Sequence, residues 1–172
     1  MDQPGWPDKS KLDDADRKLL ADVEQYGWHC LHVGDDGQLP CWSFSIGVYQ
    51  AWQHPDVVIF GLANPVSHEL LTHVVDRVRM GERFSPGRDY GDIFEEIPCC
   101  FLRVDPGWYP VFLGYAQWFY ETPDGFPVLQ LVWPDKEGQY AWDPGNRIPD
   151  GSQPLLISDD EAAALGIGPT RE

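Results

Sequence analysis

The stretch from Trp28 to Leu62 decides the fold. It reads WHCLHV (28–33), GDDGQLP (34–40), CWSFSIG (41–47), VYQAWQHP (48–55) and DVVIFGL (56–62). The first, third and last pieces are short and rich in β-branched and aromatic residues, and turn residues bound them. The pattern predicts three strands. Asp35-Asp36-Gly37 suits a hairpin turn between the first two, and the piece 48–55 reads as a polar break.

Side chains alternate between the two faces of a strand, so the first two strands can be divided by parity. In the first strand Cys30 and His32 share one face, and His29 lies on the other. The two histidines therefore cannot share a metal through that strand alone. In the second strand Ser43 and Ser45 share a small polar face, which is either solvated or lines a pocket.

Hydrophobic spacing outside this stretch predicts three helices, over residues 13–26, 66–79 and 110–120. Asn64-Pro65 suits the start of the second helix, with Asn as the cap and Pro at the first helical position. The third segment is apolar nearly all round, as in a buried helix. The same periods place these residues in one core: Leu19, Leu20, Val23, Phe44, Ile46, Val58, Phe60, Leu70, Leu71, Val74, Val75, Leu129 and Leu131.

Two further strands are expected at residues 98–104 and 126–132. The elements together predict an α+β fold, with a mainly antiparallel sheet of about five or six strands packed by about three helices. Residues 82–97 are long, polar and punctuated by Gly and Pro, and form either a lid or a surface loop. We divide the chain into a loose N-terminal arm, a single globular α+β domain and a loop-rich C-terminal extension: 1–11, 12–143 and 144–172.

Composition limits the partners. The net charge of -16 disfavours duplex DNA and anionic membranes, so we expect neither nucleic acid nor membrane as a partner. We find no apolar run of about 18 residues and no signal peptide, and we therefore expect a cytoplasmic protein. The four cysteines lack CxxC spacing and are expected to be free thiols.

Four residues are predicted to bind a ligand. Gln130 is an amide within an apolar strand, where an unpaired amide would cost on the order of 1–3 kcal/mol. It therefore either bonds to the backbone or orients a ligand. Trp133 contributes aromatic surface just past the end of that strand, where sites are commonly built. Ser43 and Ser45 complete the set through their shared polar face.

His54 and Asp135 are the candidate catalytic residues. The histidine titrates near neutral pH and is held extended by Pro55, although a structural histidine bonded to the backbone is the alternative. The carboxylate follows a strand end beside Trp133, and would otherwise cap the turn at Gly138.

Four arginines lie between residues 77 and 88, a third of the twelve Lys and Arg residues. They either pair with carboxylates or form an anion site, for which Arg83 and Arg88 are the candidates.

The signature patterns of catalysis, GxSxG, the P-loop, HExxH and GxGxxG, are absent. Cys30 and Cys41 could form a zinc site with His29, His32 or His54 only by coming together in space. We therefore predict no metal and no cofactor.

Four segments of the chain form a recognisable pattern: Tyr26-Gly27-Trp28, the run Ser43–Gly47, His54-Pro55-Asp56, and the closing segment 127–135 (PVLQLVWPD). Together they resemble a bacterial family, domain of unknown function 4262, and the closing segment is the most specific of the four. The resemblance spans roughly residues 19–142. The family often has Thr in place of Ser45 and Glu in place of Asp56. It implies one domain and no particular reaction.

Three functions remain open. The first is a small cytoplasmic binding module for a small molecule or peptide, with an apolar, aromatic-lined cleft. The second is an enzyme that uses His54 with Asp135 or Ser45 for acid/base or hydrolytic chemistry. The third is an acidic inhibitory or immunity protein that binds a basic partner.

Overall fold

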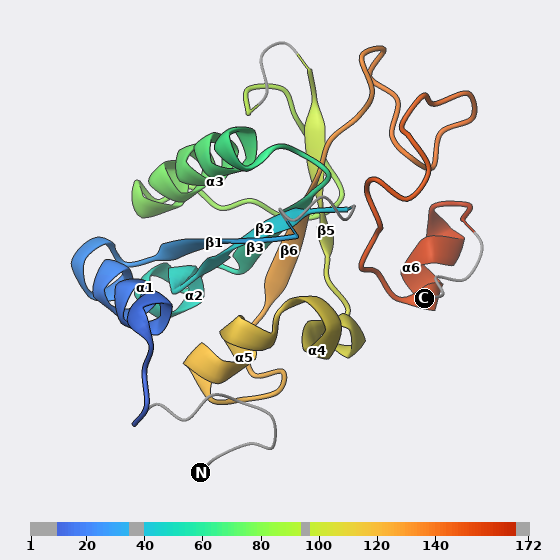
Figure 1. Cartoon of the computed structure of the whole chain (residues 1–172). Helices are drawn as coiled ribbons and strands as arrows, with labels where there is room; N and C mark the ends of the chain where they lie inside the picture. Colours follow the sequence, from blue (N-terminus) through green and yellow to red (C-terminus); the bar gives the residue numbers. More distant parts are fainter. Residues whose placement is uncertain (1–9, 35–39, 94–96, 168–172) are drawn as a thin grey trace.

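The computed structural model of the protein describes residues 10–34, 40–93 and 97–167. Within these residues the chain forms one six-stranded sheet, and the predicted α+β class is confirmed. Figure 1 shows the helices arranged around this sheet. The predicted turn at residues 35–37 and most of the arm 1–11 lie outside the described residues. In chain order the elements are α1 (Asp14–Tyr26), β1 (His29–Val33), β2 (Trp42–Ile46), α2 (Val48–Trp52), β3 (Asp56–Phe60), α3 (Asn64–Arg79), β4 (Asp89–Tyr90), β5 (Cys99–Arg103), the 3₁₀ helix η1 (Pro106–Trp108), α4 (Tyr109–Phe112), α5 (Gly114–Tyr120), β6 (Val128–Val132) and α6 (Asp159–Ala164).

The sheet is mixed. Its strand order is β1-β2-β3-β6-β5-β4, and β3 pairs with β6 in parallel while the other pairs are antiparallel. The two central strands are far apart in the sequence, and Val58 of β3 stands opposite Gln130 of β6. Their carboxyl ends therefore reach the same edge of the sheet.

Helix α1 has a stabilising feature at each end. The Asp13 side chain accepts from the backbone N–H of Asp16, and the Asp16 side chain accepts from the N–H of Asp13, which satisfies donors that the first turn leaves open. Gly27 ends the helix with a φ of 91°, a left-handed conformation that glycine adopts without steric cost.

Helix α3 differs from its prediction at the first turn. Ala63 occupies the cap position and Asn64 is already helical, so Asn64 does not cap the helix with its side chain. Pro65 lies in the first turn as expected, where its missing N–H costs nothing. The predicted apolar stripe of α3 is buried against the sheet.

The single core expected from the sequence is wrong, because the sheet divides the apolar residues into two main clusters. On one face α3 packs on Val57, Ile59, Leu129 and Leu131. On the other face Leu19 of α1 and the helices α4 and α5 pack on apolar side chains of β2, β3 and β6. In Figure 1, α3 lies on one side of the sheet and α4 and α5 lie on the opposite side.

The residues predicted to be a polar break contain helix α2. The carboxylate of Asp56 explains it, since Oδ1 accepts from the N–H of Val48 and Oδ2 accepts from the N–H of Tyr49. These are donors of the first turn of α2 that would otherwise lack partners. A helix of five residues is too short to have an amphipathic signal of its own.

The helix predicted over residues 110–120 is divided. Leu113 has non-helical dihedral angles, φ -124° and ψ 33°, and separates α4 from α5. At this break the carbonyl oxygen of Phe112 accepts from Trp42 Nε1 at 3.0 Å. The Trp42 side chain thus occupies a carbonyl oxygen that would accept from a backbone N–H in a continuous helix.

The C-terminal extension packs on the domain. Leu156 and Ile157 are buried, and the N–H of Asp105 donates to the carbonyl of Leu156 at 2.8 Å. Helix α6 starts at Asp159, and the hydroxyl of the preceding Ser158 caps it by accepting from the N–H of Glu161. No helix in the described part of the chain has both the length and the apolar character needed to cross a bilayer.

Candidate functional site

His54 is buried, and both of its ring nitrogens bond to the backbone. Nδ1 donates to the carbonyl of Pro55 at 2.8 Å, and Nε2 accepts from the N–H of Phe84 at 3.1 Å. This arrangement requires a neutral ring, and burial lowers its pKa from the ordinary value. His54 therefore fixes residue 84 beside β3, and the structure does not pair it with Asp135 or Ser45.

Gln130 is fully buried, and its amide is satisfied by the C-terminal segment. Nε2 donates to the carbonyl of Pro154 at 2.7 Å, and Oε1 accepts from the N–H of Leu156 at 2.9 Å. The side chain thus binds the backbone of residues 154–156, which lie over this face of the sheet. This matches the structural alternative considered for Gln130, a bond to backbone.

The predicted serines lie on the other face of the sheet from Gln130. Ser43 bonds to His32 beneath α3, while Gln130 points to the face that carries Leu156. Ser45 donates to Asp56 Oδ1 at 2.7 Å and accepts from the N–H of Val57. The structure therefore does not bring Ser43 or Ser45 into one cleft with Gln130.

Asp56 is buried among four donors: Ser45, Tyr120 and the N–H groups of Val48 and Tyr49. Burial raises the pKa of its carboxyl group to about 6, although the hydrogen bonds oppose this shift. The short contact between Tyr120 and Oδ2 ties α5 to the start of β3. The carboxyl group therefore links β3 to three further elements, β2, α2 and α5.

The arginines between residues 77 and 88 have separate partners. Arg77 bridges Glu82 and Asp92, which is the internal pairing considered above. Arg83 donates to the carbonyl of Gln53 at 2.8 Å, and the guanidinium of Arg88 lies over the ring of Tyr90, 4.5 Å from its centroid. Anion binding by Arg83 and Arg88 stays a prediction.

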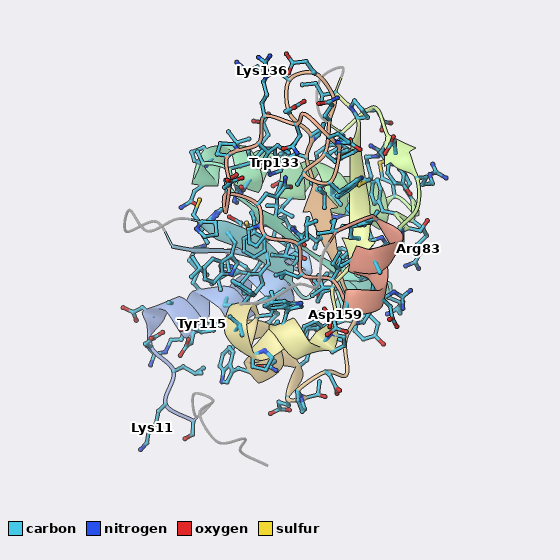
Figure 2. All side chains as sticks on the ribbon, turned by 90° about the vertical axis from the view of Figure 1, so that its right-hand side faces the viewer. Lys11, Arg83, Tyr115, Trp133, Lys136 and Asp159 are labelled. Carbon is cyan, nitrogen blue, oxygen red and sulfur yellow. The ribbon has the colours of Figure 1, made fainter. Side chains whose placement is uncertain are left out.

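Trp133 and Asp135 line a pocket at the edge where the carboxyl ends of β3 and β6 meet. Its volume is about 360 Å³. The indole N–H of Trp133 donates to the carbonyl of Phe60, the last residue of β3, at 2.7 Å. In Figure 2, Trp133 lies below the loop that carries Lys136. Ligands commonly bind near such strand ends in sheets with parallel strands.

Asp135 shapes the pocket wall. Its Oδ1 accepts from the N–H groups of Glu137 and Gln139, and its Oδ2 accepts from the N–H of Arg147. These bonds hold the pKa of the carboxyl group below its ordinary value. The residue therefore caps the turn, as one alternative expected, and also fixes residue 147 beside it.

Sequence reasoning missed two cations of this pocket, Lys136 and Arg147. In the described residues neither forms an ion pair within 4.0 Å. Pro134, Ile148 and Pro149 supply apolar wall. No sequence signal linked residue 147 to Trp133, because the Asp135 bond that joins them spans twelve residues.

A second hollow of about 370 Å³ lies at the opposite end of β6. Pro55, Tyr109 and Phe126 contribute apolar surface, and Arg103 and Asp124 line it with opposite charges. None of the predicted site residues lines it.

One cluster of metal-ligating side chains exists among the described residues: Cys30, His32 and His68. Cys30 and His32 project from the same face of β1, as the parity argument predicts. His68 belongs to α3, which packs over that face. The sequence showed the strand pair but not the helix above it.

The fold defines a small α+β protein with a mixed sheet, helices on both faces and a pocket where two parallel strands end. The chain belongs to the family described as Domain of unknown function (DUF4262), whose model matches residues 22–147. The resemblance noted in the sequence is confirmed, and the matched range contains both the pocket cations and the Cys30 cluster. Searches of curated proteins and of solved structures each found no match.

Proposed function

We propose that the protein is a binding module that holds a small molecule in the pocket beside Trp133. The observation that carries the proposal is the combination of Lys136 and Arg147, both without ion-pair partners in the described residues, with an apolar wall in one hollow. Its volume of about 360 Å³ lies in the range of small-molecule sites.

Two cations of the pocket, Lys136 and Arg147, favour a ligand with an acidic group. Asp135 also lines the pocket and interacts electrostatically with Arg147, but three backbone N–H groups occupy its oxygens. Glu137 is exposed and can turn toward solvent. Lys136 and Arg147 then remain to bind an anion, and Arg147 can do so in a bidentate manner.

The wall favours a flat apolar part in the same ligand. Trp133 is half-buried and held by its bond to Phe60, so its ring is rigid and costs little entropy on binding. Ile148 and the prolines add surface without polar groups. An aromatic carboxylate combines both features.

The free thiols support the cytoplasm as the compartment of this binding module. All four cysteines are free, and Cys99 and Cys100 are buried. Such thiols persist in a reducing environment.

The test is a titration of isotope-labelled protein with indole-3-acetate, followed by NMR. We expect shift changes at Trp133 and Ile148, and about tenfold weaker binding of the neutral amide, or about 1.4 kcal/mol. Arg147→Ala should weaken binding similarly, since the backbone N–H that serves Asp135 remains. Arg103→Ala in the second hollow is the matched control. Equal affinity for the amide, or shifts confined to the Arg103 hollow, would contradict the proposal.

A further inference from the structure

We propose that Cys30, His32 and His68 form a binding site for a borderline-soft transition metal ion, with Zn²⁺ as the ion it fits. The one potential ligand atom from each residue lies within 4.8 Å of the other two. The site is separate from the pocket beside Trp133, and neither proposal depends on the other.

The separations fit tetrahedral coordination. Zinc binds sulfur at about 2.3 Å and nitrogen at about 2.0–2.1 Å, so ligand atoms around one ion stand roughly 3.3–3.8 Å apart. The Cys30 Sγ and His32 Nε2 atoms are already 3.6 Å apart. The imidazoles of His32 and His68 have centroids 5.8 Å apart. The ligand atoms lie within 4.8 Å of one another, and His68 is exposed, so its side chain is free of core packing that would hold it away from the other two ligands.

Ser43 orients the central ligand. Its hydroxyl lies 2.6 Å from His32 Nδ1, and the two residues stand opposite each other in the β1–β2 ladder. When Nδ1–H donates to this oxygen, Nε2 presents its lone pair toward Cys30. A metal-bound histidine commonly has such a partner on its other nitrogen, because the bond fixes the tautomer and the ring plane.

Metal binding would replace the proton of the Cys30 thiol. In the absence of metal the Cys30 S–H can donate to His32 Nε2. Metal binding breaks the S–H bond, releases the proton to solvent and leaves a thiolate bound to the ion.

The donor set selects the class of metal. One sulfur and two imidazole nitrogens suit Zn²⁺ and Cu⁺, whereas Mg²⁺ and Ca²⁺ prefer oxygen ligands. Three protein ligands leave a fourth position for water or another molecule. His68 is exposed, so that position is open toward solvent.

The experiment is titration of the reduced full chain with Co²⁺, which reports thiolate coordination by a charge-transfer band, followed by displacement with Zn²⁺. We expect one Co²⁺ per chain with that band, displaced by one Zn²⁺. Cys30→Ser should remove the band. Cys41→Ser, which changes a half-buried thiol outside the cluster, should retain it.

The histidine variants provide a matched pair on one helix. His68 and His73 are both exposed on α3, so neither substitution threatens the fold. His68→Ala should weaken Zn²⁺ binding by more than about tenfold, and Ser43→Ala by about 10–100-fold through loss of orientation. His73→Ala should bind as the unsubstituted protein does. Absence of the band, or equal effects of His68→Ala and His73→Ala, would overturn the proposal, and tighter binding of Cu⁺ than of Zn²⁺ would overturn the choice of ion.

Discussion

Replacing Asp56 with asparagine tests the electrostatic account of the buried carboxyl group. The pKa of Asp56 is about 6 in the folded protein, against 3.8 for the ordinary side chain. Between about pH 3.8 and pH 6, the Asp56 carboxyl group is therefore protonated more often in the folded state than in the unfolded state. The stability that the group contributes is fully present below about pH 3.8 and is lost as the pH rises through about 6.

The size of the effect follows from the shift. One pKa unit corresponds to about 1.4 kcal/mol, so a shift of about two units is worth about 3 kcal/mol in full. Between about pH 7 and pH 4 the wild type should gain about 2 kcal/mol of unfolding free energy relative to Asp56→Asn. Burial lowers the pKa of His54, which gives a pH dependence of the opposite sign, but His54 is present in both proteins and cancels in the difference.

The assay is urea unfolding at several pH values, followed by tryptophan fluorescence. Asp135→Asn is the control, since backbone N–H bonds lower the pKa of Asp135 and its contribution is lost as the pH falls. The two variants should therefore deviate from the wild type in opposite directions. If the difference in unfolding free energy between the wild type and Asp56→Asn did not change with pH, or fell as the pH was lowered, the four hydrogen bonds would outweigh desolvation. The electrostatic account of this carboxyl group would then be refuted.

Two further predictions concern structure. Gln130→Ala should lower the unfolding free energy by about 1–3 kcal/mol, because the carbonyl of Pro154 and the N–H of Leu156 lose their partner, and urea unfolding measures it. An unchanged stability with weakened ligand binding would instead favour the ligand role. Thiol titration of the unfolded protein without reductant should count four thiols, and in the folded protein Cys99 and Cys100 should react slowly because burial raises their pKa to about 12. Two thiols in the unfolded protein would contradict the free-cysteine assignment.

The site was only partly predictable from the sequence. Trp133 and Asp135 could be identified because they follow a strand end in sequence, and strand ends are local features. Lys136 and Arg147 could not, since a bond across twelve residues brings Arg147 to the pocket. The parity of β1 already placed Cys30 with His32, but the packing of α3 was needed to add His68.

The sequence alone determined the local elements of this protein. The ends of α1 follow from Asp13, Asp16 and Gly27, which act within one or two turns of the helix. The strands follow from short runs that are rich in β-branched and aromatic residues and bounded by turn residues, and the fold class follows from their combination with the helices. These features need only contacts between near neighbours in the chain.

Tertiary structure decided the features that depend on distant partners. The parallel pairing of β3 with β6 joins residues more than seventy positions apart. Helix α2 forms where Asp56 accepts from its first turn, and the break at Leu113 coincides with a bond from Trp42. The polarity of Gln130 is explained only by backbone groups 24 and 26 residues away. A local pattern does not encode such partners, because the same side chain satisfies its hydrogen bonds equally well with a backbone group, a ligand or water.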